Sequence, residues 1–220
     1  MYDLSMNSIS ININKYSKLN LLIFLNFFFI TFAFNVLAID RNIPKTNEEW
    51  DRAWASLNWK DGPSVVNYNQ ANSKINISSN FKILEGKDAH QLLYWFNGVD
   101  FDYVDVYAMG EKGEQYMFFY TDSGYVKTDD WTDVDPNKFL KEVKENYKSS
   151  NETRKKNGQA TVLDVTWKKK PYLDGIYNSV YYALNVTWSD NTSTVEGSAI
   201  ILGKEGYTTG KYVAGDNGYQ

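Results

Sequence analysis

The sequence of 220 residues contains no cysteine and a single histidine, His90. The lack of cysteine excludes disulfides, thiolate metal sites, thiol nucleophiles and the cysteine-based anchor of bacterial lipoproteins. One histidine cannot form the multi-histidine set of a catalytic zinc site. A serine–histidine–aspartate triad would need His90, but the segment around Ser123 does not match the GxSxG motif. We therefore interpret His90 as a structural residue on or beside a helix surface.

The chain has no excess of basic residues. It contains 23 lysines and arginines and 27 aspartates and glutamates, which gives a net charge of −4. This mild acidity argues against nucleic acid as a partner. A glycine-rich phosphate loop is absent too, because the segment Gly206–Lys211 has neither the spacing nor the Ser or Thr that should follow the lysine. We expect no bound cofactor.

A long hydrophobic run occurs only at the N-terminus. Lys15 and Lys18 precede the uncharged segment Leu19–Leu37, which ends in a cleavage-site pattern at Ala38. The pattern predicts a signal peptide over residues 1–38 and export to the periplasm or cell envelope. The alternative is an uncleaved membrane anchor, because the segment approaches the roughly 18–20 residues that span a bilayer. Cleavage would leave 21 basic and 26 acidic residues, a net charge of −5.

The remaining chain mixes helix and strand patterns without regular β-α-β alternation. A capping box at Thr46 and Glu49 predicts a helix to about Leu57, and further helices are predicted over Gly86–Asn97 and from Pro136 to about Asn157. Strands are predicted over residues 64–69, 73–77, 81–84, 103–109, 114–121, 124–127, 160–167, 178–188, 194–203 and 206–213. We therefore expect an α+β fold with a mainly antiparallel sheet and about three helices.

The expected organisation is one domain behind the signal peptide. We assign residues 39–56 to a helical lead-in, residues 57–215 to a single envelope domain and residues 216–220 to a tail. A chain of this size can bury a core of its own without disulfides.

Six stretches in order carry a resemblance to a known family. They are LNWKDGP (57–63), INISSNFKIL (75–84), GYVKTDD (124–130), NETRKKNG (151–158), DVTWKKKPYLD (164–174) and ILGKEGY (201–207). On these stretches the chain resembles the family catalogued as domain of unknown function 2167, described as predicted membrane-anchored bacterial proteins. The resemblance implies an exported α+β envelope domain with no established activity.

The chain departs from the family pattern in two places. Members often have arginine where Lys204 stands, and they usually continue into a C-terminal membrane helix, whereas 14 residues follow Gly206 here. We therefore expect membrane contact only through the N-terminal segment, if that segment stays uncleaved.

Six residues form the candidate functional surface. They are Asp129, Asp130, Arg154, Trp167, Tyr172 and Asp174. The lysines between Trp167 and Tyr172 suit either a solvated strand-end loop or a patch for anionic headgroups or polysaccharide. The 7 tryptophans and 17 tyrosines suit a packed sheet as well as a binding face, so they do not decide between these functions.

Acidic residues cluster around Asp100, Asp102 and Asp105. Asp100 and Asp102 would share one face of an extended segment, and paired carboxylates hydrolyse glycosides when their separation in space is right. A pair in a turn is also expected by chance in an acidic chain. The paired-aspartate hydrolase is therefore an alternative function, not the first one.

A second acidic run precedes the longest predicted helix. Asp133, Asp135 and Asn137 match the first three ligands of a calcium loop, but Lys138 and Lys144 occupy the places of its glycine and bidentate glutamate. We therefore assign no metal site and interpret Asp135 as the N-cap of the helix.

The first hypothesis is a non-enzymatic envelope domain that binds a protein or other envelope component. The alternatives are the polysaccharide hydrolase and a carbohydrate-binding module that uses exposed aromatic rings. No residue is assigned a catalytic, cofactor-binding or metal-binding role, and the partner is an unknown envelope protein or polysaccharide.

The helix-cap interpretation predicts that Asp135→Ala lowers the melting temperature equally with and without calcium. Loss of an N-cap costs on the order of 1 kcal/mol, because a backbone N–H of the first turn loses its acceptor. Thermal melts with calcium and with a chelator provide the measurement. A loss of stability that depends on calcium would support the metal loop instead.

Overall fold

The computed structural model describes residues 40–68, 73–126, 128–132 and 134–215, apart from the side chains of Ser73, Asp129 and Asp130. The helices are α1 (Asn47–Ala55), α2 (Gly86–Asn97) and α3 (Pro136–Lys156), with a short 3-10 helix at Thr128–Trp131. The strands are β1 (Lys60–Asp61), β2 (Ser64–Tyr68), β3 (Ser73–Ile77), β4 (Phe81–Glu85), β5 (Val106–Gly110), β6 (Gln115–Asp122), β7 (Val162–Asp174), β8 (Ser179–Trp188), β9 (Ser193–Leu202) and β10 (Gly206–Gly215).

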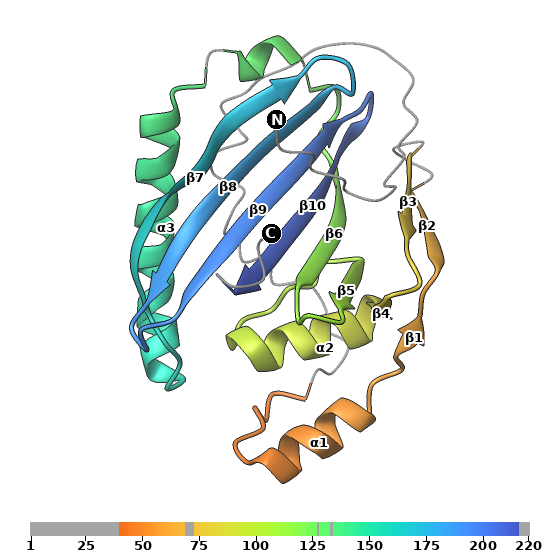
Figure 1. Cartoon of the computed structure of the whole chain (residues 1–220), viewed down its shortest axis with the longest axis vertical. Coiled ribbons are helices and arrows are strands. Elements are labelled where there is room, and N and C mark those ends of the chain that lie inside the picture. The colour runs from red at the N-terminus through yellow and green to blue at the C-terminus, as the bar shows by residue number, and fades with distance from the viewer. Residues whose placement is uncertain (1–39, 69–72, 127, 133, 216–220) are drawn as a thin grey trace.

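Eight strands form one antiparallel sheet in the order β1-β4-β5-β6-β10-β9-β8-β7, and β2 pairs separately with β3. Figure 1 shows α3 beside β7 at one edge of this sheet and the β2–β3 hairpin towards the other edge. The arrangement confirms the predicted α+β fold with a mainly antiparallel sheet and three helices. No helix among the described residues is long and apolar enough to cross a bilayer.

Both long helices cover the same face of the sheet. One row of directly paired residues crosses it as Tyr107, Met117, Lys211, Ser198 and Tyr182. Side chains in such a row point to one face. Met117 packs in the core cluster of α2, and the Tyr182 ring meets Phe139 of α3 edge-on with 5.2 Å between the ring centroids. The opposite face over β4, β5 and β6 is covered by the β2–β3 hairpin.

The local signals placed the helices well. The capping box at Thr46 is formed, α2 has the predicted bounds, and Gly98 ends it with φ 68°. The helix α3 begins at Pro136, and Asp135 accepts a hydrogen bond from the backbone N–H of Asn137 at 2.8 Å, which confirms the N-cap.

One strand prediction and one loop prediction were wrong. The segment from Gly124 to Val126 is not a strand, because Gly124 takes φ 68° and its N–H bonds to the carbonyl of Glu205, so the chain turns away from β6. Lys127, the end of that prediction, lies outside the described residues. The lysine run is not a strand-end loop either, because β7 continues to Asp174 and Leu173 pairs with Val180.

Candidate functional site

The strand β7 lies at the edge of the sheet and pairs with β8 alone. Its register shifts between Trp167 and Lys169 and again between Lys169 and Tyr172, so the lysine run occupies a bulged part of the strand. The Lys169 ammonium lies 5.3 Å from the centre of the Tyr172 ring, within reach of a cation–π interaction. The two side chains therefore form a basic and aromatic pair near the end of the strand.

The turn that joins β7 to β8 is held in a defined shape by Asp174. Its Oδ1 accepts the backbone N–H of Ile176 at 2.9 Å and that of Tyr177 at 3.3 Å. Asn178 adopts φ 48°, and its carbonyl accepts the N–H of Leu202 at 2.9 Å, which ties the turn to the end of β9. Asp174 is therefore a turn-forming residue whose Oδ1 atom accepts both of these backbone N–H groups.

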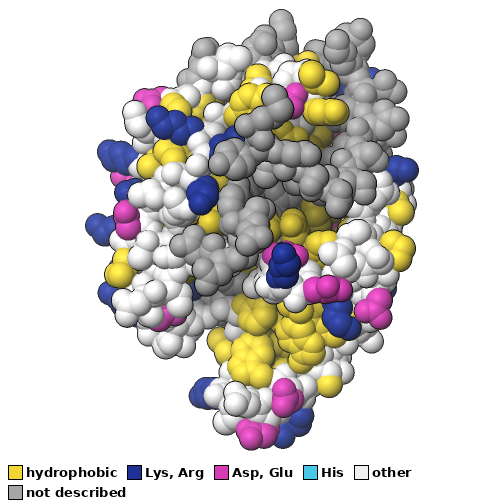
Figure 2. Space-filling model, viewed as in Figure 1, with side chains coloured by type: hydrophobic (Ala, Val, Ile, Leu, Met, Phe, Trp, Pro, Cys, Tyr) yellow, Lys and Arg dark blue, Asp and Glu magenta, His cyan; other side chains and the backbone are white. Residues whose placement is uncertain are grey.

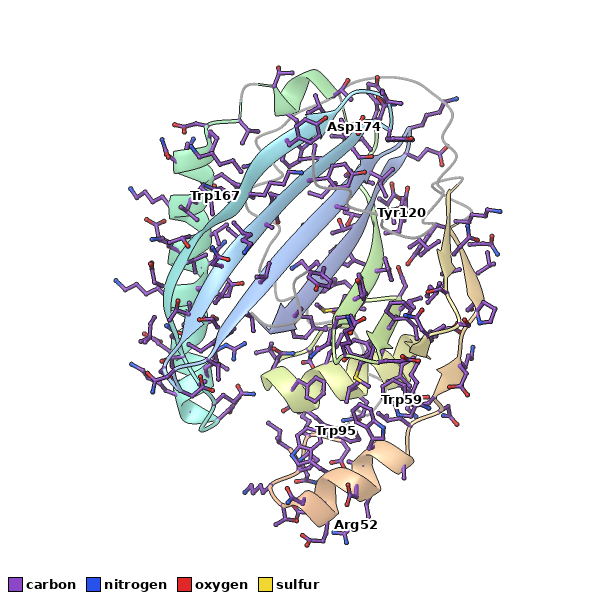
Figure 3. The ribbon with its side chains drawn as sticks, viewed as in Figure 1. Arg52, Trp59, Trp95, Tyr120, Trp167 and Asp174 are labelled. Atoms are coloured by element: carbon purple, nitrogen blue, oxygen red, sulfur yellow. The ribbon has the colours of Figure 1, made fainter. Side chains whose placement is uncertain are left out.

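This turn and the end of β7 carry three of the exposed large apolar side chains of the described residues, among them the most exposed one, Ile176. Ile176 is 85% exposed, Tyr177 is 61% exposed and Tyr172 beside the turn is 52% exposed. We call the following set the hairpin-tip surface: Lys168, Lys169, Lys170, Tyr172, Ile176 and Tyr177. Figure 3 shows Asp174 at the same end of the sheet as Tyr120.

Some residues of the hairpin-tip surface can be explained by the needs of the fold alone. An edge strand with free backbone groups can pair with other chains, and lysines, proline and bulges on the strand prevent such pairing. That accounts for the lysine run and for Pro171 in β7. It does not account for Ile176 and Tyr177, which lie beyond the end of the strand and protect no strand edge.

Arg154 serves the packing of the helices. Its guanidinium donates to the Ala160 carbonyl and to Asn97 Oδ1, both at 3.4 Å, and lies 4.7 Å from the centre of the Trp188 ring. Burial lowers the pKa of Arg154, and nearby Glu196 acts in the opposite direction. The side chain joins α3 to the end of α2 and to β8, so it is not an exposed recognition group.

Trp167 also belongs to the core. Its ring stacks on Phe139 of α3 with 5.7 Å between the centroids and meets Tyr182 of β8 edge-on at 6.1 Å. Figure 3 shows it beside α3. Asp129 and Asp130 lie in the 3-10 helix Thr128–Trp131, and their side chains lie outside the described part of the structure.

The structure therefore brings together only part of the predicted functional surface. Tyr172 and Asp174 share the hairpin, whereas Arg154 and Trp167 hold α3 to its neighbours. Sequence reasoning missed Ile176 and Tyr177, although a strongly apolar pair directly after Asp174-Gly175 was the available signal, because turns are usually polar.

The acidic cluster after α2 lies on an open loop. Asp100 forms an ion pair with Arg41 at 3.1 Å, and Asp102 is exposed. Partial burial raises the pKa of Asp105, while the N–H of Tyr120, 3.0 Å from its carboxylate, lowers it. Water reaches both members of the proposed catalytic pair, so the geometry gives the paired-aspartate hydrolase little support.

The other candidate residues have local structural partners. The Nε2 atom of His90 lies 2.8 Å from the Val104 carbonyl, and Lys144 donates to Asp164 at 2.8 Å. Asp133 lies outside the described residues. Within the described ranges, no group of three or more His, Asp or Glu side chains is placed to hold a metal ion.

A polar group lies between the two helix-covered core clusters. The Tyr147 hydroxyl of α3 donates to Glu196 Oε2 at 2.5 Å. Burial and the contact with Glu196 raise the pKa of Tyr147 well above its ordinary value, and burial lowers the pKa of Lys211. Such shifts also occur at catalytic sites, but here the contacts of Tyr147 and Glu196 join α3 to the sheet.

The aromatic side chains near α1 form a further surface feature. Figure 2 shows hydrophobic side chains gathered between α1 and the sheet. Trp54 and Trp59 stack on each other with centroids 4.5 Å apart, and Trp50 packs against Phe96 at 5.6 Å. All seven tryptophans are buried or half-buried. Trp54 and Trp59 cover one face of each other's ring, and no tryptophan of the chain is fully exposed to a sugar.

The comparisons with known proteins agree with the resemblance drawn from the sequence. The chain belongs to the family described as "Protein of unknown function (DUF2167)", which matches residues 49–220. No curated protein matches the chain at a significant level. Among solved structures it is similar to the solution structure of cyanobacterial PsbP (CyanoP) from Synechocystis sp. PCC 6803. The identity is 13%, the coverage is 70% of this chain and 81% of that chain, and the TM-score is 0.38. A similarity of this size carries no functional argument.

The packing role of Arg154 predicts that Arg154→Lys destabilises the fold by about 1–2 kcal/mol. Lysine lacks the planar guanidinium that donates to two acceptors and contacts the Trp188 ring. Chemical denaturation measures this change. Lys155→Ala, which removes an exposed neighbour, is the control and should change stability by less than about 0.5 kcal/mol. Equal effects of the two substitutions would contradict the packing role.

Proposed function

We propose that this protein is an exported, non-enzymatic domain of the bacterial envelope that binds another envelope component through the hairpin-tip surface. The observation that carries the proposal is the exposure of Ile176 and Tyr177 on a turn that Asp174 holds in place. Contiguous exposed apolar side chains on an otherwise well-packed domain are typical of interaction sites. Aromatic residues in particular are enriched where proteins bind partners.

The shape of the turn strengthens this interpretation. Hydrogen bonds from two backbone N–H groups to Asp174 and from Leu202 to Asn178 fix the turn before any partner arrives. Binding therefore needs little ordering of the turn, and less conformational entropy is lost on association. A binding site on a rigid scaffold is the arrangement expected of a recognition loop.

Export rests on the predicted signal peptide, and the packing of the mature N-terminus is compatible with cleavage after Ala38. Asp40, two residues after Ala38, donates its N–H to Gln91 Oε1 at 2.7 Å and accepts from Gln91 Nε2 at 2.8 Å. Gln91 is buried in α2, and Arg41 lies 5.2 Å over the Tyr94 ring. The chain that would remain after cleavage thus has a docking place on α2 from its second residue.

A carbohydrate-binding module is the second candidate. The observation in its favour is the exposure of the Tyr172 and Tyr177 rings on the hairpin. The turn between them projects an aliphatic side chain, Ile176, which gives a sugar ring no flat platform. We therefore place this function behind the binding of an apolar or membrane component.

Export predicts a defined mature mass. The chain recovered from the envelope or periplasm of expressing cells should have the mass of residues 39–220, with Ile39 as its first residue. The Ala38→Lys variant is the control, because a long charged side chain at the cleavage position blocks processing and should leave the full mass. An unprocessed wild-type chain in the membrane fraction would favour the uncleaved anchor.

Binding through the hairpin predicts that Ile176→Ser weakens sedimentation of the protein with isolated envelopes by about tenfold or more, from the loss of one buried aliphatic side chain. Leu163→Ser is the matched control, since Leu163 is 65% exposed but lies at the start of β7, whereas Ile176 follows the end of that strand. Equal envelope affinity of wild type and Ile176→Ser would refute the binding role of the tip.

A further inference from the structure

We infer that the hairpin-tip surface docks on an anionic lipid bilayer, with Ile176 and Tyr177 entering the headgroup boundary and the lysines binding lipid phosphates. The inference rests on the proposed function and names the partner of the same surface. It also adds a membrane contact that is independent of the N-terminal apolar segment.

The charge of the tip is opposite to that of the protein. The segment Lys168–Tyr177 holds three lysines and one aspartate, whereas the whole chain has a net charge of −4. The carboxylate of Asp174 already accepts two backbone N–H groups. The neighbouring β9–β10 turn carries Lys204 and Glu205, which cancel. Asp122 ends β6 beside this turn, so the excess positive charge belongs to the β7 hairpin and not to the whole end of the sheet. An acidic surface would therefore attract the hairpin.

The apolar part of the tip matches a membrane interface. Tyrosine is enriched at the headgroup level, where its ring is buried and its hydroxyl stays in water. Lysines beside apolar residues keep their stems along the acyl boundary and their ammonium groups among the headgroups. Lys169 already lies over the Tyr172 ring, so the two groups are held together before contact.

The shape of the tip favours a soft surface over a rigid partner. Ile176 is the most exposed large apolar residue in the described part of the chain, and it lies in the turn, with Tyr172 before it and Tyr177 after it. A protruding aliphatic side chain needs a complementary pocket in a folded protein, whereas a bilayer accepts it wherever it lands. Polysaccharides stack on flat aromatic faces, whereas the most exposed side chain of the tip is the aliphatic Ile176.

The lack of cysteine allows a local test in the full-length chain. Ile176→Cys carries an environment-sensitive fluorophore and is titrated with vesicles of phosphatidylglycerol and phosphatidylcholine, or of phosphatidylcholine alone. We expect a blue-shifted, stronger emission with the anionic vesicles. Glu111→Cys with the same fluorophore is the control, because the exposed β5–β6 turn lies at the other end of the sheet and should not respond.

Removing the lysine charges gives a quantitative test of the same inference. Each lysine near an acidic membrane contributes about fivefold to binding, so replacing Lys168, Lys169 and Lys170 by glutamine should weaken the response of the labelled chain roughly a hundredfold. Circular dichroism melts of the triple variant show whether the edge strand still folds. A loss confined to the anionic vesicles, with the fold intact, supports the inference.

Other outcomes overturn it. An equal response at position 111 would mean that the N-terminal segment brings the whole chain to the bilayer. A response to soluble peptidoglycan or lipopolysaccharide sugars, but not to vesicles, would assign the tip to polysaccharide. A silent label with all vesicles, while Ile176→Ser still loses envelope binding, would reject the lipid and leave the proposed function standing.

Discussion

The contact between the C-terminal ends of α2 and α3 is the constraint on which the other features depend. Arg154 reaches Asn97, and Gln159 Nε2 donates to the Phe96 carbonyl at 2.8 Å. The Asn151 amide exchanges two hydrogen bonds of 2.8 Å with the backbone of Val162, the first residue of β7. Since β7 has one neighbouring strand only, these bonds fix where the edge strand begins, and through it the place of the hairpin.

The ends of the helices could be predicted from the sequence, because they depend on residues that are neighbours along the chain. The capping box at Thr46, the left-handed Gly98 and the Asp135-Pro136 start all act within one turn of a helix. The shared face of α2 and α3 was not readable, because it depends on register across five strands. The lysine run was misplaced for a related reason: proline and consecutive charges are typical of loops, but at a bulged sheet edge they are also compatible with a strand.

The candidate site was predicted only in part, and there is a physical reason why some of its residues were found and others were missed. Arg154 and Trp167 were chosen from stretches that carry the family resemblance, and both turn out to join α3 to the sheet or to α2. A residue that packs elements together gives a strong sequence pattern. Ile176 and Tyr177 follow the stretch that ends at Asp174, and two apolar residues in a turn have no periodicity. Their exposure becomes evident only when the turn is placed in space.

The hairpin also has to meet two opposing demands. An exposed apolar tip beside an unpaired sheet edge would promote association between copies of the chain. The lysines, Pro171 and the register shifts of β7 oppose pairing at the edge. Asp174 fixes the backbone of the turn that carries Ile176 and Tyr177. The lysines that repel the β7 edge of another copy would also be attracted to an acidic surface. One set of residues can therefore both protect the edge strand and take part in binding at the tip.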